Sequence, residues 1–122
     1  MTHAAAPITV LVVEDDHFVR MDAVDIVEEA GFLALEAENA DEALRLLEDN
    51  PAIRIIFTDI DMPGSMDGIR LAHAVRDRWP PVTIIIASGH HRPASHEMPT
   101  RARFFPKPYA RAAVKAALLE AA

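Results

Sequence analysis

Five short apolar segments, separated by stretches whose apolar residues have helical spacing, limit this chain to few folds. The segment at residues 8–13 (ITVLVV) is continuous and β-branched, which is typical of a strand buried on both faces. The other expected strands lie at 32–37, 53–57 and 82–87, and a short last one begins at 104–105. Strands that alternate with helical segments predict an α/β domain with a parallel sheet.

The helical segments lie at 16–30, 39–50, 67–79 and 109–122. Gly31 is expected to cap the first of them, and Asn39 with Glu42 is typical of a capping box. Right-handed crossovers place helices on both faces of such a sheet, and ligands bind outside the carboxyl ends of its strands. The residues directly after each strand are therefore the candidates for a functional site.

The stretch at 89–103 (GHHRPASHEMPTRAR), between the last two expected strands, is poorly suited to a helix. Met98 is its only larger apolar residue, and Pro99 cannot lie inside a helix without loss of a hydrogen bond. We expect this helix to be short, irregular or mobile. No paired spacing relates the histidines of the stretch, which favours a solvated loop over a metal-binding or pH-sensing site: His90, His91 and His96.

Composition excludes several classes of protein. The chain of 122 residues is the length of one domain, its core is expected at about 8–120, and no output domain follows. It has no cysteine, no apolar run long enough for a membrane span and no secretory leader, so a cytoplasmic protein is expected. The net charge of −7 argues against nucleic-acid binding. A start at Met1 favours a natural short protein.

Polar residues that suit one another chemically follow four of the expected strands. Acids follow two strands, a serine a third and a lysine the last: Glu14, Asp15, Asp16, Asp59, Asp61, Ser88 and Lys107. Taken singly, an acid could be an N-cap or a turn residue, the serine a loop residue and the lysine a solvated charge. If all of these separate explanations held, chance alone would have placed chemically complementary residues at several separate strand ends.

The chemistry of this set indicates phosphoryl transfer. Clustered carboxylates without histidine or cysteine suit Mg²⁺, which takes one or two carboxylates, waters and phosphate oxygens. A carboxylate can also be the nucleophile that forms an aspartyl phosphate. A lysine supplies a point charge to a phosphate oxygen, and phosphoryl transfer needs little beyond positioning and charge neutralisation.

The motifs VLVVEDD, TDIDMPG, ASG and PKPY occur in this order, and together they make the chain resemble a response-regulator receiver domain of two-component signalling. The resemblance covers nearly the whole chain, from Ile8 to the last helix. It implies a flavodoxin-like doubly wound (βα)5 fold whose parallel strands have the order 2-1-3-4-5. It also implies a signalling phosphoacceptor that catalyses only its own phosphorylation and dephosphorylation.

The resemblance assigns a role to each matching residue. Asp59 matches the phosphoryl acceptor, which a histidine kinase or a histidine phosphotransfer protein would phosphorylate. Glu14, Asp15, Asp59 and the backbone carbonyl of Asp61 match the Mg²⁺ site. Ser88 matches the switch hydroxyl, Phe104 the aromatic switch, and Lys107 the lysine that precedes a cis proline. Asp61 and His90, two residues beyond Asp59 and Ser88, are expected to tune dephosphorylation.

Several alternatives stay open at the level of the sequence. The chain resembles stand-alone, chemotaxis-regulator-like receivers and also receivers excised from hybrid histidine kinases. Asp59-Ile60-Asp61 is an Asp-x-Asp motif of the kind used by haloacid-dehalogenase-like phosphatases, but those carry it on their first strand. A pseudo-receiver that never accepts phosphate usually lacks the acceptor or the lysine, and both are present here. The expected assembly is a monomer or a weak homodimer, without nucleic-acid or membrane partners.

Overall fold

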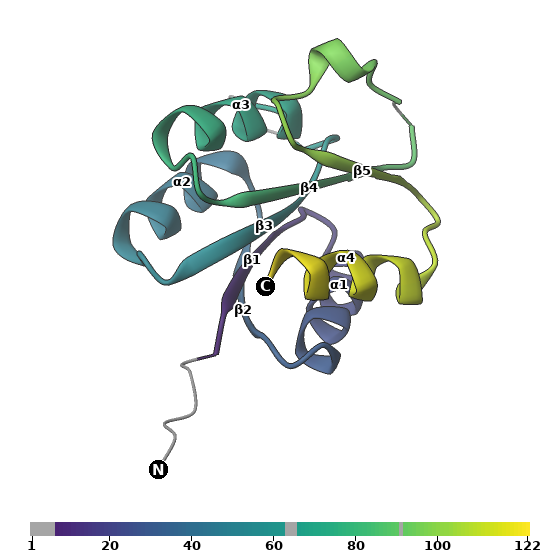
Figure 1. Ribbon diagram of the computed structural model, residues 1–122. Coiled ribbons are helices and arrows are strands. Elements are labelled where there is room, and N and C mark those ends of the chain that lie inside the picture. The colour runs from purple at the N-terminus through teal and green to yellow at the C-terminus, as the bar shows by residue number, and fades with distance from the viewer. Residues whose placement is uncertain (1–6, 63–65, 91) are drawn as a thin grey trace.

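The computed structural model describes residues 7–62, 66–90 and 92–122, so the expected Pro63-Gly64 turn and His91 lie outside the described residues. Within these ranges, five parallel strands form one sheet in the order β2-β1-β3-β4-β5 (Figure 1). This arrangement confirms the predicted flavodoxin-like topology. The elements are β1 (Thr9–Val13), α1 (His17–Glu29), β2 (Leu33–Ala37), α2 (Ala40–Asp49), β3 (Ile53–Asp59), α3 (Gly68–Arg78), β4 (Thr83–Ser88), the 3-10 helix η1 (Ser95–Glu97), β5 (Arg103–Pro106) and α4 (Arg111–Ala121).

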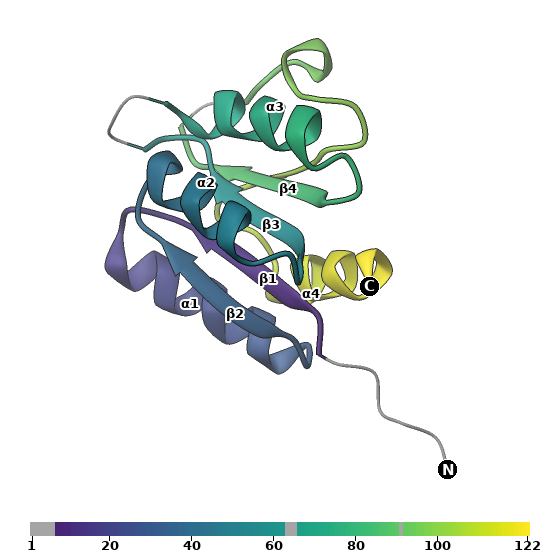
Figure 2. The same ribbon diagram turned by 90° about the vertical axis from the view of Figure 1, so that its left-hand side faces the viewer.

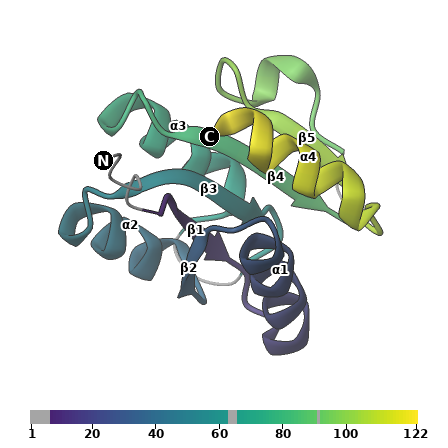
Figure 3. The same cartoon turned by 60° about the horizontal axis from the view of Figure 1, so that its bottom comes forward.

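The sheet separates two apolar layers. Figure 2 and Figure 3 show α2 and α3 on one face and α1 and α4 on the other. Successive residues of β1 point to opposite layers: Val10 and Val12 join the layer of α1 and α4, and Leu11 and Val13 join the other. Because helices cover both faces, every residue of β1 is buried, which explains the continuous apolar run.

The strands β3 and β4 extend further than the apolar pattern predicted. Strand β3 ends at Asp59 rather than at residue 57, and β4 ends at Ser88 rather than at residue 87. The parallel ladder continues between them, with Asp59 opposite Ala87. The two candidate site residues therefore belong to the sheet, and the ladder fixes their backbone.

Side-chain caps set the starts of three helices. Asp16, Asn39 and Asp67 each accept a hydrogen bond from a backbone N–H in the first turn of α1, α2 and α3. Only half of the expected capping box forms at α2, because the Glu42 carboxylate accepts from the Glu38 N–H instead of the Asn39 N–H. No helix in the described ranges is long and apolar enough to cross a membrane.

The segment between β4 and β5 confirms the expected short, irregular helix. Its helical structure in the described residues is η1, of three residues. Two side chains of α3 hold the segment: His73 Nε2 lies 2.7 Å from the Glu97 carbonyl oxygen, and Arg76 Nε donates to the Thr100 carbonyl at 3.0 Å. Met98 packs against the core layer of α2 and α3. Contacts with α3 therefore replace the packing of a full amphipathic helix.

Candidate functional site

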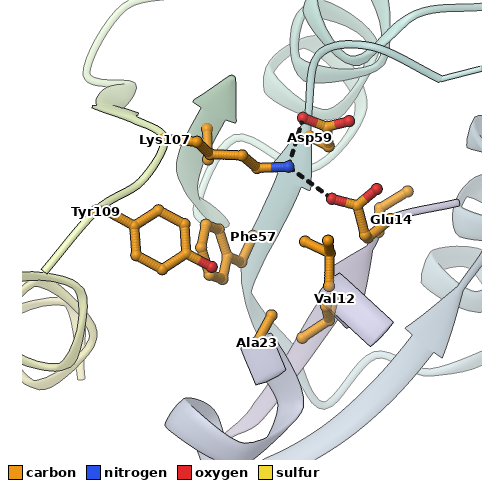
Figure 4. A pocket seen from close by; sticks show the side chains of 10 residues that line it. Val12, Glu14, Ala23, Phe57, Asp59, Lys107 and Tyr109 are labelled. Atoms are coloured by element: carbon orange, nitrogen blue, oxygen red, sulfur yellow. Dashed lines mark hydrogen bonds and ion pairs between the residues drawn. The ribbon is translucent and has the colours of Figure 1, made fainter. Parts of the chain in front are cut away.

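The carboxyl ends of four strands, β1, β3, β4 and β5, bring the candidate residues together. Asp59 and Ser88 are the last residues of β3 and β4, Glu14 directly follows β1, and Lys107 directly follows β5. Figure 4 shows the Lys107 ammonium between the carboxylates of Asp59 and Glu14, above the apolar side chains of Val12 and Phe57. The structure thus unites residues that are up to 93 positions apart in the sequence.

Lys107 forms ion pairs with both buried acids. Its Nζ lies 2.8 Å from Glu14 Oε1 and 3.1 Å from Asp59 Oδ1. The backbone positions this side chain, because the Lys107 N–H donates to the Ser88 carbonyl at 2.9 Å. The Lys107 ammonium is therefore held between the carboxylates of Glu14 and Asp59. The Lys107–Pro108 peptide bond is cis, as expected.

Burial and charge shift the pKa values of this group. Burial raises the pKa of the Asp59 carboxyl above its usual range, and the charge of Lys107 offsets only part of that effect. Burial likewise raises the pKa of the Glu14 carboxyl. Burial by itself lowers the pKa of Lys107, but the hydrogen bond to Glu14 and the charge of Asp59 raise it above its usual value. The two buried acids thus share one positive charge, that of Lys107. The remaining negative charge favours the binding of a cation.

The acidic cluster fits Mg²⁺ by the chemistry of its donors. One carboxylate oxygen each from Glu14, Asp15 and Asp59 lies within 4.8 Å of the others. All three donors are hard oxygen ligands, and Asp15 is exposed, so waters can complete an octahedral shell. These residues could hold the ion that the sequence predicted, whereas the role of the Asp61 carbonyl stays a prediction.

The Ser88 hydroxyl has a partner that the sequence did not reveal. Its Oγ donates to Asp61 Oδ2 at 3.0 Å and accepts from the His90 N–H at 3.3 Å. Both residues expected to tune dephosphorylation therefore touch the predicted switch hydroxyl. The predicted aromatic switch, Phe104, is half-buried and lines a hollow together with Ser88 and Lys107.

Gly68 is a site residue that sequence reasoning missed. Its N–H donates to the Ile60 carbonyl at 2.9 Å, and α3 begins there. A Cβ atom at this position would collide with the backbone carbonyl of Asp59, far inside van der Waals contact. In the sequence this glycine stands only near the start of the helical segment at 67–79, and its place directly after the N-cap residue Asp67 is the signal that could have found it.

Arg20 is a second residue that sequence reasoning missed. The sequence analysis did not single out this arginine, although only 7% of the residue is exposed. A single arginine in a helical pattern does not indicate burial, because arginines on an exposed helix face have the same spacing.

Comparisons with known proteins agree with this geometry. Residues 10–118 match the family model described as "Response regulator receiver domain". The "Sensor kinase CckA" of Brucella abortus is 34% identical over 112 residues, which are 88% of this chain and 12% of the kinase. The "Response regulator receiver protein CpdR" of the same organism is 31% identical over 103 residues, which are 82% of this chain and 84% of that protein.

A solved structure shows the same likeness in three dimensions. The response regulator receiver domain protein from Clostridium thermocellum superposes with a TM-score of 0.84 at 25% identity, over 93% of this chain and 92% of that one. The lengths of the relatives differ widely. The chain spans only 12% to 17% of several curated relatives, the sensor kinase among them.

Proposed function

This chain belongs to the response regulator receiver domain family, and on that premise we propose that Asp59 accepts a phosphoryl group from a phosphohistidine. The observation that carries the proposal is the environment of Asp59. Its carboxylate is buried at the end of β3, with Lys107 Nζ at 3.1 Å and the carboxylates of Glu14 and Asp15 beside it. A buried nucleophile, a fixed cation and an acidic cation site are the parts that phosphoryl transfer needs.

The transfer step follows from this arrangement. A carboxylate oxygen of Asp59 attacks the phosphorus in line as the phosphorus–nitrogen bond breaks, and the electron pair of that bond stays on the imidazole of the donor. Lys107 is placed to neutralise a phosphoryl oxygen, since its ammonium already lies beside the attacking group. When bound by Glu14, Asp15 and Asp59, Mg²⁺ supplies further positive charge for the phosphoryl oxygens.

The switch involves Ser88 and Phe104. The new phosphoryl oxygens are acceptors for the Ser88 hydroxyl, which must leave Asp61 Oδ2 to reach them. Phe104 borders the same hollow and turns inward when Ser88 moves. Phosphorylation in this way biases two arrangements of the same residues and changes the surface next to β5.

Hydrolysis ends the signal. Water attacks the phosphorus, the bond between the phosphorus and the Asp59 oxygen breaks, and the carboxylate is regenerated. Asp61 and His90 flank the path of this water and set part of the lifetime, because an acid and an imidazole can orient water or assist proton transfer. Their contacts with Ser88 place both residues beside the site.

The proposed partners are a histidine kinase or a histidine phosphotransfer protein. Relatives of two architectures match the chain, a sensor kinase of which it spans 12% and a receiver protein of which it spans 84%. The same phosphoacceptor chemistry serves a stand-alone regulator and a receiver within a hybrid kinase. Whether a histidine kinase gene neighbours the gene of this chain would separate the two.

Intact-mass measurement after incubation with acetyl phosphate and Mg²⁺ tests the proposal. The wild-type chain should gain one phosphoryl mass, and Asp59→Asn should gain none. Asp77→Asn, an exposed aspartate on α3, is the control and should behave as the wild type. An equal gain of mass in Asp59→Asn would show that another residue is the acceptor.

A further inference from the structure

Among the described residues, Arg20 is the one buried charged side chain that the proposed chemistry does not use. It lies on the first turns of α1, below the loop that carries Glu14 and Asp15. A buried guanidinium is costly unless its donors are satisfied, so its partners indicate why it is there.

The guanidinium joins the acidic loop to strand β2. Arg20 Nη1 donates to the backbone carbonyl of Glu14 at 2.9 Å, in a buried hydrogen bond. Its Nε donates to Glu36 Oε1 at 3.0 Å, and its Nη2 lies 3.3 Å from His17 Nδ1 and 3.8 Å from Glu38 Oε1. The planar fork of an arginine can serve these partners at once, which the single ammonium of a lysine cannot do.

The Glu14 backbone is consequently held on both sides. Its N–H donates to the Ala37 carbonyl of β2 at 3.0 Å, and its own carbonyl accepts from Arg20. These bonds hold the peptide groups on both sides of Glu14, and hence the directions in which the carboxylates of Glu14 and Asp15 leave the chain. We propose that Arg20 is a positioning residue that braces the cation site through the Glu14 carbonyl. This inference rests on the proposed function, in which Glu14 and Asp15 hold Mg²⁺.

A second effect of Arg20 opposes the first. A positive charge behind the acidic cluster lowers the affinity for a cation, whereas a fixed backbone raises it, because ligands that repel one another need not be ordered on binding. The Glu36 carboxylate at 3.0 Å offsets part of the Arg20 charge, so we expect the positional effect to dominate. Loss of Arg20 should tighten Mg²⁺ binding if its charge matters more and weaken Mg²⁺ binding if its position matters more. A measured affinity therefore separates the two effects.

The test is the dissociation constant of Mg²⁺ alone, measured by NMR titration of the Asp15 and Asp59 amides in unphosphorylated protein. Arg20→Lys keeps the charge and loses the fork, and Arg20→Met loses both. Both should weaken Mg²⁺ binding by about tenfold, as is usual for residues that orient metal ligands. Tighter binding in Arg20→Met would show that charge, not position, is the main effect and would overturn the proposal.

Arg76→Lys is the matched control. Arg76 also bridges backbone carbonyls, those of Pro80, Val82 and Thr100, but it does so away from the acidic cluster. This variant should lose stability and keep the wild-type dissociation constant. A constant within twofold of the wild type in both folded Arg20 variants would reduce Arg20 to a structural tie between α1 and β2. A wild-type chain that binds no Mg²⁺ would instead count against the proposed function.

A second pair of variants serves if the Arg20 variants do not fold. Glu36→Gln removes the close anchor of the guanidinium at 3.0 Å, and Glu38→Gln removes the same charge at 3.8 Å. If Arg20 positions the cation site as proposed, Mg²⁺ binding should be weaker in Glu36→Gln than in Glu38→Gln. Equal constants in these two variants would show that the Glu36 anchor does not act on the cation site and would overturn the proposal.

Discussion

The carboxylate of Asp59 has a raised pKa because burial disfavours its charged form more than Lys107 favours it. A folded-state pKa above the unfolded value means that the native state binds the proton more tightly. Stability therefore falls as the pH rises from the usual carboxyl range through the raised pKa. At neutral pH the ionised Asp59 carboxylate costs stability, and Glu14 adds to that cost for the same reason.

Asp59→Asn should consequently raise the free energy of unfolding in metal-free buffer at pH 7. The amide resembles the protonated acid, so it avoids the burial of a charge, and a gain of about 1 kcal/mol is the usual scale for one substitution. Urea unfolding between pH 5 and pH 8 should also show a flatter pH dependence in this variant. Asp77→Asn is the control, and a loss of stability in Asp59→Asn at pH 7 would contradict the prediction.

Asp61 and His90 are expected to set the lifetime of the phosphorylated state. Asp61→Ala removes the acceptor of the Ser88 hydroxyl as well as a group beside the attacking water. His90→Ala keeps the backbone N–H that bonds to Ser88, so it tests the imidazole alone. Dephosphorylation rates after removal of the phosphodonor decide the matter. Rates unchanged within twofold in both variants would refute a role for either side chain.

The strand-end residues were predictable because a parallel sheet brings the ends of its strands to one edge, whatever the loops do. Glu14, Asp59 and Lys107 meet for that reason. Arg20 and Gly68 were not predictable from helical spacing, because the burial of the first and the close approach at the second depend on what lies opposite. The bond between Ser88 and Asp61 depends on two loop conformations that no periodic pattern encodes.

At the scale of elements, the segment between β4 and β5 differs most from a regular helix. Its helical length was predictable from Pro93 and Pro99, but the burial of these prolines and the contacts with α3 were not. A segment that depends on side chains of its neighbour has few backbone hydrogen bonds of its own. The segment can therefore open locally while the sheet stays folded.

Hydrogen exchange should show residues 92–102 exchanging far faster than β3 and β4. Arg76→Lys should speed exchange further at the Ala102 amide, because Arg76 holds the neighbouring Thr100 carbonyl and one such hydrogen bond contributes about 1 kcal/mol. The amides of β3 serve as the internal control. Strong protection across the segment in a monomer would contradict this view of it.

At the scale of the whole molecule, the exposed apolar side chains lie away from the segment between β4 and β5. The large exposed ones among the described residues are Phe18 and Met21 on α1, Leu33 on β2 and Leu119 on α4. A full helix before β5 could offer an apolar face for association, but none of these exposed apolar side chains lies in the segment between β4 and β5. The net charge of −7 further opposes self-association, because two molecules of the same net charge repel each other.

We therefore expect a monomer, or a weak homodimer that uses α1 or α4. Sedimentation velocity over a range of protein concentrations, with and without acetyl phosphate and Mg²⁺, measures this directly. Phe18→Ser should abolish a dimer through α1 and Leu119→Ser a dimer through α4, because each removes exposed apolar surface on its helix. His96→Ser, an exposed residue of η1, is the control and should leave the association unchanged. A dimer that His96→Ser abolishes and the other two variants leave intact would place the interface at the segment between β4 and β5, contrary to this prediction.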